Sequence, residues 1–405
     1  MTTTAYETER KYELPAGRPL PRLDDLPEVA GSSDPQEYDL EAEYYDTDDF
    51  RLIRHGVTLR RRRGGTDPGW HLKLPAGGKT RREIRLPLGR GGRQVPARLA
   101  ALVRGYTRGA ALRPVARIHT RRQVRTLVDD AGGSLAEIAA DDVSAQTLGE
   151  QTALSQWNEL EVELTGGGRR LLKAADARLR QDGLQPSDRS AKLERALAGQ
   201  LPSDAGQPAG NGQHPALPPG SAGAAVLGYL RQQADRLLSF DPLVRLDEPD
   251  AVHQMRVTSR RLRSTFQAFT EVIPAERSEK LIGELKWLGG VLGKARDAEV
   301  LEERLDRRVR ETPAEQVVGP VAARVQAHFA PVRAAARQEA VAALDSPRYA
   351  ALLDSLDGLL AVPALPAEAT RPAGAVLPAA AHRAYRRTGR RLRRAARTAP
   401  GPARD

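Results

Sequence analysis

Residues 159–164 read Glu-Leu-Glu-Val-Glu-Leu, so a strand here would carry three carboxylates on one face and Leu, Val and Leu on the other. Alternation with a period of two residues predicts a β-strand. A face of three carboxylates is costly to bury unless cations or a bound ion compensate the charge. The stretch therefore predicts a sheet with one apolar side and one side lined by charged groups.

The same alternation recurs through the N-terminal half of the chain. It is present at residues 7–11, 60–62, 71–74, 81–86 and 117–124. Turn sequences rich in Gly and Asp separate these segments, as at 63–69 and 129–133. Several short alternating strands divided by turn signals predict a sheet closed into a barrel.

The charged faces of these segments carry both signs of charge. Glu7, Glu9 and Lys11 share one face of the first segment, and by themselves they would fit an ordinary solvated surface. The other segments add Arg60 and Arg62, Lys73, the set Arg81, Glu83 and Arg85, and the pair Arg117 and Arg121. If these faces all point inward, the interior cannot be a folded core without a ligand. Such an interior suits a polyanion bound together with Mg²⁺ or Mn²⁺, because carboxylates bind the hard cation and Arg and Lys bind phosphate oxygens.

In this order and spacing, residues 5–200 resemble the CYTH superfamily, the triphosphate tunnel proteins. The motifs are Glu7-x-Glu9-x-Lys11, Tyr44-Tyr45-Asp46-Thr47, Leu59-Arg60-Arg61-Arg62, His71-Leu72-Lys73-Leu74-Pro75, Arg82-Glu83-Ile84-Arg85, Trp157 to Leu164, and Ser190-Ala191-Lys192. The resemblance implies an eight-stranded antiparallel tunnel that binds triphosphate compounds with a divalent metal. Members cleave inorganic triphosphate, thiamine triphosphate or RNA 5′-triphosphates, and one branch cyclises ATP.

The resemblance also implies roles for individual residues. It makes Glu7, Glu9, Lys11 and Glu161 catalytic, and Arg60, Arg62, Lys73, Arg85, Arg121 and Lys192 substrate-binding. The implied metal ligands are Glu7, Glu9, Asp142, Glu159, Glu161 and Glu163. Three choices stay open: Arg121 is preferred over Arg122, Asp142 over Asp141, and two of the three late glutamates are expected to reach the metal. We expect Arg61 and Arg63 to face outward, and His55 and His119 to be structural or surface groups.

The C-terminal half reads as helices. Residues 221–239, 250–273, 276–308, 313–344, 346–361 and 375–397 are rich in Ala, Leu and Arg and are separated by Pro or Gly. In the second, apolar positions from Val252 to Phe269 recur at helical spacing and predict a face buried in a bundle. Two basic stripes accompany this pattern, one at His253, Arg256, Arg260 and Arg263 and one over residues 383–397. No Asp or Glu lies within 251–270 or 371–404, so both stripes favour an anionic partner.

The segment 252–263, with 285–288 and 292–297, resembles the CHAD family of helical bundles, which bind inorganic polyphosphate in a basic groove. The implied contacts are His253, Arg256, Arg260, Arg261, Arg263, Lys294, Arg296, Arg383, Arg387 and Arg390. The family's internal duplication should bring a second helix of this type after the Arg-rich one, and no second copy of the signature is present. We therefore expect an incomplete bundle that holds the first half of the usual duplication, either because the sequence is a fragment or because the domain is a half. We place the domains at 1–200 and 221–405, with a linker at 201–220 rich in Gly and Pro.

Composition excludes several classes of protein. The chain has 405 residues, a formal net charge of +11 and no Cys, which rules out a disulfide scaffold, a thiolate metal site and a cysteine nucleophile. No signal peptide or membrane span is evident, and the bias toward Ala, Arg, Gly and Pro suggests a GC-rich bacterial genome. We expect a cytoplasmic protein associated with polyphosphate granules, with no membrane or nucleic-acid partner and an open oligomeric state.

The leading interpretation is an α+β protein in which a charged tunnel hydrolyses inorganic triphosphate or a related triphosphate and a helical domain binds polyphosphate. Mg²⁺ or Mn²⁺ is the expected cofactor. Two alternatives remain, a non-catalytic polyphosphate-binding protein and an adenylyl cyclase. Carboxylates in the tunnel argue against the first, because a pure anion-binding site gains nothing from them.

Overall fold

The computed structural model of the chain describes residues 3–78, 80–89, 92–149, 152–187, 189, 191–201, 217–361 and 365–397. It divides into two compact units, Met1–Gln207 and Pro208–Asp405, which are described separately below. Most of the predicted linker, residues 202–216, lies outside the described residues, as does Ser190 of the last tunnel motif.

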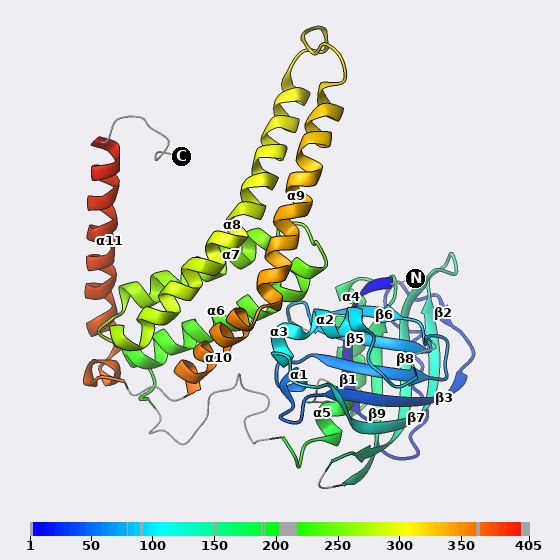
Figure 1. The fold of residues 1–405 in the computed structure, drawn as a ribbon. Coiled ribbons are helices and arrows are strands. Elements are labelled where there is room, and N and C mark those ends of the chain that lie inside the picture. The colour runs from blue at the N-terminus through cyan, green and yellow to red at the C-terminus, as the bar shows by residue number, and fades with distance from the viewer. Residues whose placement is uncertain are drawn as a thin grey trace. The chain divides into compact units, whose positions relative to one another are not determined.

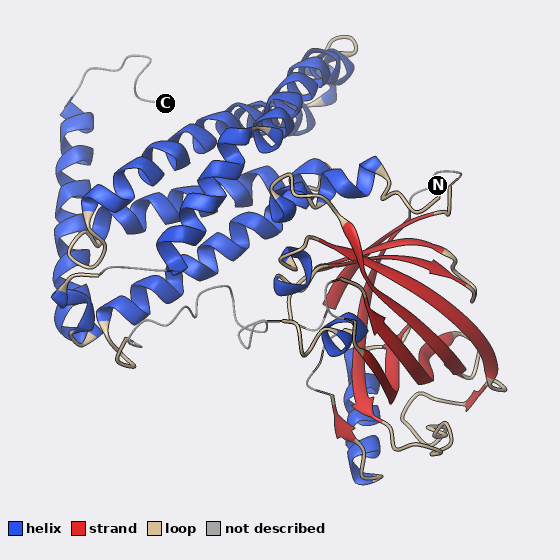
Figure 2. Ribbon diagram, turned by 60° about the horizontal axis from the view of Figure 1, so that its bottom comes forward, coloured by secondary structure: helices blue, strands red, loops and turns tan. Residues whose placement is uncertain are grey.

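The first unit is a closed antiparallel barrel, shown in Figures 1 and 2. Its neighbouring strands follow the order β1, β6, β5, β4, β3, β7, β8, β9, and β9 pairs with β1 to close the ring. Their bounds are β1 Thr3–Glu13, β3 Gln36–Asp46, β4 Thr58–Arg63, β5 Gly69–Pro75, β6 Thr80–Leu86, β7 Arg113–Val128, β8 Ser134–Thr147 and β9 Leu154–Leu164. Short strands β2 (Gly31–Ser32) and β10 (Gln185–Pro186) extend β7 and β1. The predicted eight-stranded antiparallel barrel is confirmed.

Helix α4, Arg169–Gln181, determines which face of β9 points outward, because it packs on the outside of the barrel against this strand. Leu171 and Leu172 of α4 share one buried cluster with Leu160 and Val162 of β9 and with Ile138 of β8. Burial of these apolar side chains against the helix stabilises this orientation of the strand. The opposite face of β9, which carries the glutamates, therefore points into the barrel.

The Tyr-Tyr-Asp-Thr motif forms the corner between β3 and α1, Arg51–Arg54. The ring of Tyr45 packs 5.0 Å from that of Trp70 on the outer wall. The buried Asp46 carboxylate accepts backbone N–H bonds from Thr47, Leu52 and Ile53 at 2.7, 2.8 and 2.9 Å, and so holds the start of the helix. Burial raises the pKa of Asp46 to about 6, although the three N–H donors act in the opposite direction. The short helix α3 (Arg104–Thr107) lies beside α1, and α2 (Ala97–Leu102) packs on α3.

Helix α5, Lys192–Ala196, reaches the inside of the barrel. Leu193 and Leu197 belong to a buried cluster with Val143 and Trp157, whose side chains lie on the inner faces of β8 and β9. The helix begins at Lys192, so this packing brings a buried lysine into the interior.

The second unit is helical (Figure 2). Its elements are α6 Ala222–Arg245, α7 Ala251–Ala268, α8 Ala275–Glu311, α9 Val321–Asp345, α10 Pro347–Ala361 and α11 Ala373–Arg397, with short 3₁₀ turns η1 at Ala314–Gln316 and η2 at Ala367–Thr370. Met255, Leu262 and Phe266 of the predicted apolar stripe are buried in the bundle, which confirms that stripe. Among the described residues, no helix is both long enough and apolar enough to cross a membrane.

Candidate functional site

The inner faces of the strands enclose a cavity of about 420 Å³. Of the predicted substrate-binding residues, Arg60, Arg62, Lys73, Arg85 and Lys192 line it. Five of the predicted catalytic or metal-binding residues also line it, namely Glu7, Glu9, Lys11, Glu161 and Glu163. The barrel therefore brings together, around one space, charged groups that lie as far apart in the chain as Glu7 and Lys192.

Three buried carboxylates, those of Asp141, Glu159 and Glu161, form one cluster, in which an oxygen of each lies within 4.8 Å of the others. The ammonium Nζ of Lys192 lies at their centre, 2.8 Å from Asp141, 2.6 Å from Glu159 and 2.7 Å from Glu161. Their oxygens thus already surround one compact cationic group.

Two further cations hold this acidic cluster. The guanidinium of Arg122 donates to Asp141 from Nε at 2.7 Å and from Nη2 at 2.6 Å, and also bonds Glu161. Lys11 bonds Glu161 and lies 3.5 Å from Glu9. Burial acts to raise the pKa of Glu161, but Lys11, Lys192 and Arg122 outweigh it and hold the pKa well below its usual range. Glu161 is therefore ionised at neutral pH.

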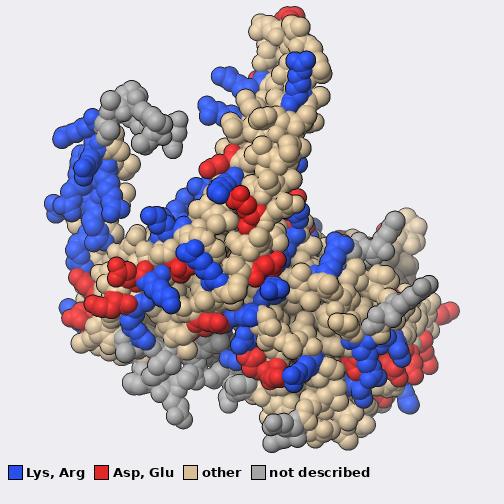
Figure 3. Space-filling view, viewed as in Figure 1, with Lys and Arg blue, Asp and Glu red and all other residues tan. Residues whose placement is uncertain are grey.

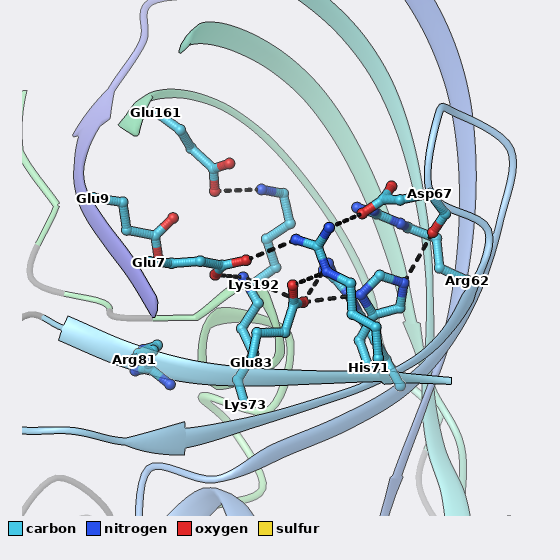
Figure 4. A network of polar contacts seen from close by, with 12 residues as sticks. Glu7, Glu9, Arg62, Asp67, His71, Lys73, Arg81, Glu83, Glu161 and Lys192 are labelled. Carbon is cyan, nitrogen blue, oxygen red and sulfur yellow. Dashed lines mark hydrogen bonds and ion pairs between the residues drawn. The ribbon is translucent and has the colours of Figure 1, made fainter. Parts of the chain in front are cut away.

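Figure 4 shows a second network on the opposite part of the wall, centred on Glu7 and Glu83. Lys73 bonds Glu7, and Nη2 of Arg85 donates to Glu7 at 3.1 Å. Arg85 also bonds Glu83, whose carboxylate lies 2.9 Å from Nδ1 of His71. Glu83 is fully buried, and the cations of Arg85, Lys73 and Arg60 balance its charge. The network fixes the direction of Lys73 and Arg85.

Arg60 and Arg62 lie between these networks on β4. Arg60 donates to the hydroxyl of Tyr44 at 3.3 Å, and Arg62 bonds Asp67 in the turn between β4 and β5. The Nε atoms of both arginines are buried and lack a hydrogen-bond partner within the described part of the chain. Burial, followed by the charges of Arg60 and Arg122, lowers the pKa of Arg62 to about 9, so it stays charged at neutral pH. Buried cations with unsatisfied donors indicate a site that is completed by an anion.

The position of Glu163 differs from that of the acidic cluster. It lines the cavity near Glu7 and Glu9, and burial followed by the charge of Glu7 raises its pKa to about 7. Glu159 and Glu161, but not Glu163, belong to the acidic cluster.

Two of the predicted positions are wrong by one residue. Arg121 is exposed on the outer wall, where it is paired in register with the exposed Asp142. Their neighbours Arg122 and Asp141 are also paired in register, and these two side chains face inward. A shift of one residue along a strand moves a side chain to the opposite face. On β7 the outer face carries Arg117, His119 and Arg121, and this charged outer face misled the prediction.

Sequence reasoning also gave no role to Glu83 or His71, although both lie in the quoted motifs. The signal for Glu83 was available, because it alternates with Arg81 and Arg85 on one face. No pattern in the sequence places His71 against Glu83, since that contact depends on the register of β5 with β6.

The basic residues of the helical unit are mostly exposed, and Figure 3 shows Lys and Arg side chains gathered along α11. Several of the predicted contacts are paired with carboxylates: Arg256 with Asp297 at 3.5 Å, Lys294 with Glu339 at 2.8 Å, Arg296 with Glu299 at 3.0 Å and Arg383 with Glu271 at 2.6 Å. Arg387 donates to the backbone oxygen of Gln267 at 3.1 Å. Within the described residues, the side chains of His253, Arg260, Arg261, Arg263 and Arg390 form no hydrogen bond or ion pair.

Family models identify both halves of the chain. The CYTH domain model matches residues 5–190, and the CHAD domain model matches residues 228–405. The chain is a CYTH–CHAD protein. Because it is a CYTH domain, the barrel has the triphosphate tunnel fold.

Two curated relatives come from Mycobacterium tuberculosis, uncharacterized proteins of strains CDC 1551 / Oshkosh and ATCC 25618 / H37Rv. Each is 37% identical over 412 residues, covering 98% of this CYTH–CHAD chain and 77% of the relative. Among solved structures, PptA from Streptomyces chartreusis is 24% identical with a TM-score of 0.35, covering 45% of this chain and 62% of that one. A Hippeastrum protein described as a candidate adenylyl cyclase with a dominant triphosphatase activity is 16% identical with a TM-score of 0.30, covering 49% of this chain and 98% of that one.

CYTH tunnel enzymes usually use divalent metals, and the acidic cluster has the ligands that such an ion needs. Asp141, Glu159 and Glu161 offer only carboxylate oxygens, which hard cations such as Mg²⁺ and Mn²⁺ prefer. The three oxygens already converge on the ammonium of Lys192 at 2.6–2.8 Å. The donor set and its convergence therefore fit a divalent cation. Among the predicted ligands, Glu7 and Glu9 line the same cavity and Asp142 faces outward.

Proposed function

We propose that the CYTH domain hydrolyses inorganic triphosphate or a closely related triphosphate with Mg²⁺ or Mn²⁺, and that the CHAD domain binds inorganic polyphosphate. The observation that carries the first part is the shared cavity. Cations of β4, β5, β6, β7 and α5 face it together with carboxylates of β1 and β9. A triphosphate is a compact polyanion, and this lining supplies the charge-assisted hydrogen bonds that its oxygens need.

The roles of the residues follow from their contacts. Arg60 and Arg62 would bind phosphate oxygens with the guanidinium groups that line the cavity, and Lys73 would add a third cation. Asp141 and Glu161 would hold the metal together with Glu159, and the bound metal would neutralise phosphate oxygens and activate a water molecule. Binding by fixed cations keeps the chain of phosphates aligned for in-line attack on a terminal phosphorus.

Arg122 would position the metal ligands. It grips Asp141 with two bonds and reaches Glu161, so it fixes two carboxylates at once. Lys192 would replace its contacts with the three carboxylates by a contact with a phosphate oxygen. Its ammonium lies where the carboxylates converge, and a phosphate oxygen is an equally good partner. We therefore expect Lys192 to move toward the substrate when a divalent cation binds the carboxylates.

An assay of phosphate release distinguishes the three candidate functions of the tunnel: triphosphatase, adenylyl cyclase and non-catalytic binding. The purified chain is given tripolyphosphate or ATP with Mg²⁺, with Mn²⁺ or with EDTA. The proposal expects phosphate from tripolyphosphate that disappears with EDTA. Cyclic AMP and pyrophosphate from ATP, without cleavage of tripolyphosphate, would establish a cyclase, and binding of tripolyphosphate without any turnover would establish a non-catalytic tunnel.

A matched pair of variants tests whether the tunnel is responsible. Glu161→Gln should lower turnover by about 10- to 100-fold, the usual effect of disturbing a metal site. Glu37→Gln removes the same charge from an exposed position on the outer face of β3, in neither cavity lining, and should leave turnover unchanged. Equal activity of both variants would contradict the assignment.

The second part of the proposal rests on α7 and α11. Arg260 and Arg263 have no carboxylate partner within the described residues, and α11 carries a dense row of exposed arginines. Such surfaces favour a polyanion, and phosphate chains are the natural ligand where stacking aromatics are few. Binding of this kind would place the protein on polyphosphate granules in the cytoplasm.

A gel shift with long-chain polyphosphate tests this part. The triple variant Arg256→Ala, Arg260→Ala, Arg263→Ala should lose most of the affinity. The control variant removes three exposed arginines of α8, Arg304, Arg307 and Arg308, and should lose much less. Binding should weaken steeply with salt. Equal displacement by double-stranded DNA of matched charge would mean a general basic surface and would refute a polyphosphate site.

A further inference from the structure

A second concave site lies on the outer wall of the barrel, separate from the tunnel. We call it the outer groove; its volume is about 830 Å³, and its charged lining comprises Glu41, Glu43, Arg61, Arg63, Arg93 and Arg117. The strand register explains this gathering of arginines. Glu43 of β3 is paired with Arg61 of β4 on one side and with Arg117 of β7 on the other, and Glu41 is paired with Arg63.

The contacts of Glu43 show how the outer groove is held. Glu43 is buried, and it accepts hydrogen bonds from the Tyr45 hydroxyl at 2.6 Å and from Arg117 at 3.3 Å, with Arg93 at 3.8 Å. Burial acts to raise the pKa of Glu43, but Tyr45 and the two arginines outweigh it and lower the pKa. This carboxylate therefore orients Arg93 and Arg117 and has little capacity left for other cations.

Arg61 and Arg63 differ from this pair because they have no partner of their own. Neither side chain forms a hydrogen bond or ion pair within the described part of the chain, and the Nε atom of Arg61 is buried without a partner. The lining thus holds four guanidinium groups against two carboxylates. A concave surface with surplus positive charge and a buried unsatisfied donor needs an anion to complete it.

We propose that the outer groove is an accessory binding site for a chain of inorganic phosphates, a site that rests on the function proposed above for the tunnel. Planar guanidinium groups bind phosphate oxygens in a bidentate manner. Arg61 and Arg63 are two residues apart on one strand, about 6.6–7 Å, so they reach different phosphates of one chain. A chain of several phosphates can therefore engage both side chains at once.

The position of the outer groove links it to the tunnel. Arg62 points into the tunnel between Arg61 and Arg63, and β4 ends at Arg63. The turn that follows contributes Asp67 to the tunnel lining. The tunnel and the outer groove therefore meet at this rim of the barrel. A long polyphosphate can lie in the outer groove while its end is near the tunnel, which a free triphosphate is too short to do.

Nucleic acid fits the outer groove less well. Its lining in the described structure contains no Phe, Tyr or Trp on which a base could stack, and His119 is bonded to Asp39. Proteins that bind single strands without sequence preference combine a basic groove with such aromatic platforms. A phosphate chain without bases needs only the cations.

Arginine-selective modification with phenylglyoxal, read by mass spectrometry on the full chain, tests the proposal. The reaction is run in EDTA with long-chain polyphosphate, tripolyphosphate or single-stranded DNA at equal phosphate concentration. At ten times the dissociation constant, long-chain polyphosphate should slow modification of Arg61 and Arg63 by about tenfold, because about one site in eleven is then free. Tripolyphosphate should slow Arg60 and Arg62 instead, and Arg121, exposed on the outer wall beyond the groove, should react at an unchanged rate with either ligand.

Variants localise the effect to the outer groove. In the double variant Arg61→Ala, Arg63→Ala, polyphosphate should no longer protect Arg117. The control double variant Arg22→Ala, Arg121→Ala loses two exposed arginines away from the groove and should keep that protection. Unprotected Arg61 and Arg63 in the native chain, or equal protection by DNA, would overturn the proposal. The assay needs no turnover, so a failure of the tunnel to hydrolyse triphosphate would be seen separately in phosphate release.

Discussion

Asp141 and Asp142 offer a sharp test of the site, because adjacent aspartates face opposite sides of the barrel wall. Asp141 is buried and accepts two hydrogen bonds from Arg122 at 2.7 and 2.6 Å, with Lys192 at 2.8 Å. Asp142 is exposed on the outer wall. Asp141→Asn and Asp142→Asn each remove one negative charge and keep almost the same side-chain shape. Any difference in stability or turnover between the two variants therefore reflects the inward or outward position of the aspartate.

The expected cost of Asp141→Asn follows from its contacts. Each hydrogen bond to a charged group contributes about 1.5–3 kcal/mol, and the asparagine oxygen can still accept one of the bonds from Arg122. Glu161 stays beside both cations, so the loss should be about 2–3 kcal/mol rather than the roughly 3–5 kcal/mol of a fully uncompensated buried charge. For a domain of this size that is a fall in Tm of about 4–12 °C. Asp142→Asn should stay within about 0.5 kcal/mol.

The pH dependence of this cost follows from the pKa of Asp141. Burial acts to raise that pKa, but Arg122 and Lys192 outweigh it and hold the pKa below 3.8. A lowered carboxyl pKa contributes stability at pH values above the pKa in the unfolded chain, and this stability is lost as the pH falls through the folded value. The difference between Asp141→Asn and the native chain should therefore be constant from about pH 5 to pH 9 and shrink below about pH 4.

Two measurements on the three proteins check this reasoning. Differential scanning calorimetry gives the Tm of the transition of the N-terminal domain, and phosphate release from tripolyphosphate gives turnover at 25 °C, where all three proteins are folded. Asp141→Asn should lose about 10- to 100-fold in turnover, and Asp142→Asn should match the native chain. An Asp142→Asn variant as impaired as Asp141→Asn would refute the inward position of Asp141.

Three further outcomes are expected from the tunnel. Arg122→Ala should lower the turnover of tripolyphosphate by about 10- to 100-fold, because Asp141 and Glu161 lose the guanidinium group that positions them, whereas Arg121→Ala, on the outer face, should leave turnover unchanged. Steady-state kinetics test this, and an equal loss in both variants would contradict their assigned faces. Lys192→Met removes the ammonium that the three carboxylates surround. In a thermal-shift titration, Mn²⁺ should therefore raise the Tm of this variant more than that of the native chain. An equal rise would mean that the ammonium and the metal do not compete. Asp67→Asn frees Arg62 from its carboxylate partner and should lower the KM for tripolyphosphate a few-fold, whereas a higher KM would show that Asp67 helps to bind the substrate.

Much of the molecule could be predicted from local patterns. The period of two residues around Glu161 and the helical spacing around Met255 predicted a barrel followed by a bundle, and the structure has both. The charges on the inner face were also predictable where one face of a strand is apolar and packs under a helix. Leu160 and Val162 settle the orientation of β9 in this way, because burial of these side chains against α4 leaves Glu161 no other direction.

The amino-acid sequence by itself thus determined the two architectures and most of the charged groups of the tunnel. Only the tertiary structure decided between Arg121 and Arg122 and between Asp141 and Asp142. Around Asp141 and Asp142 both faces of β8 carry apolar side chains, so this strand holds no hydrophobic signal that distinguishes inside from outside. On β7, Ile118 and Val124 share the inward face with Arg122, but that face lines a charged cavity rather than an apolar core. The register of β7 against β3 and β8, together with Lys192 entering on α5, places one set of charges around a common cavity. Those contacts join residues far apart in the chain, and their free energy exists only once the barrel has closed.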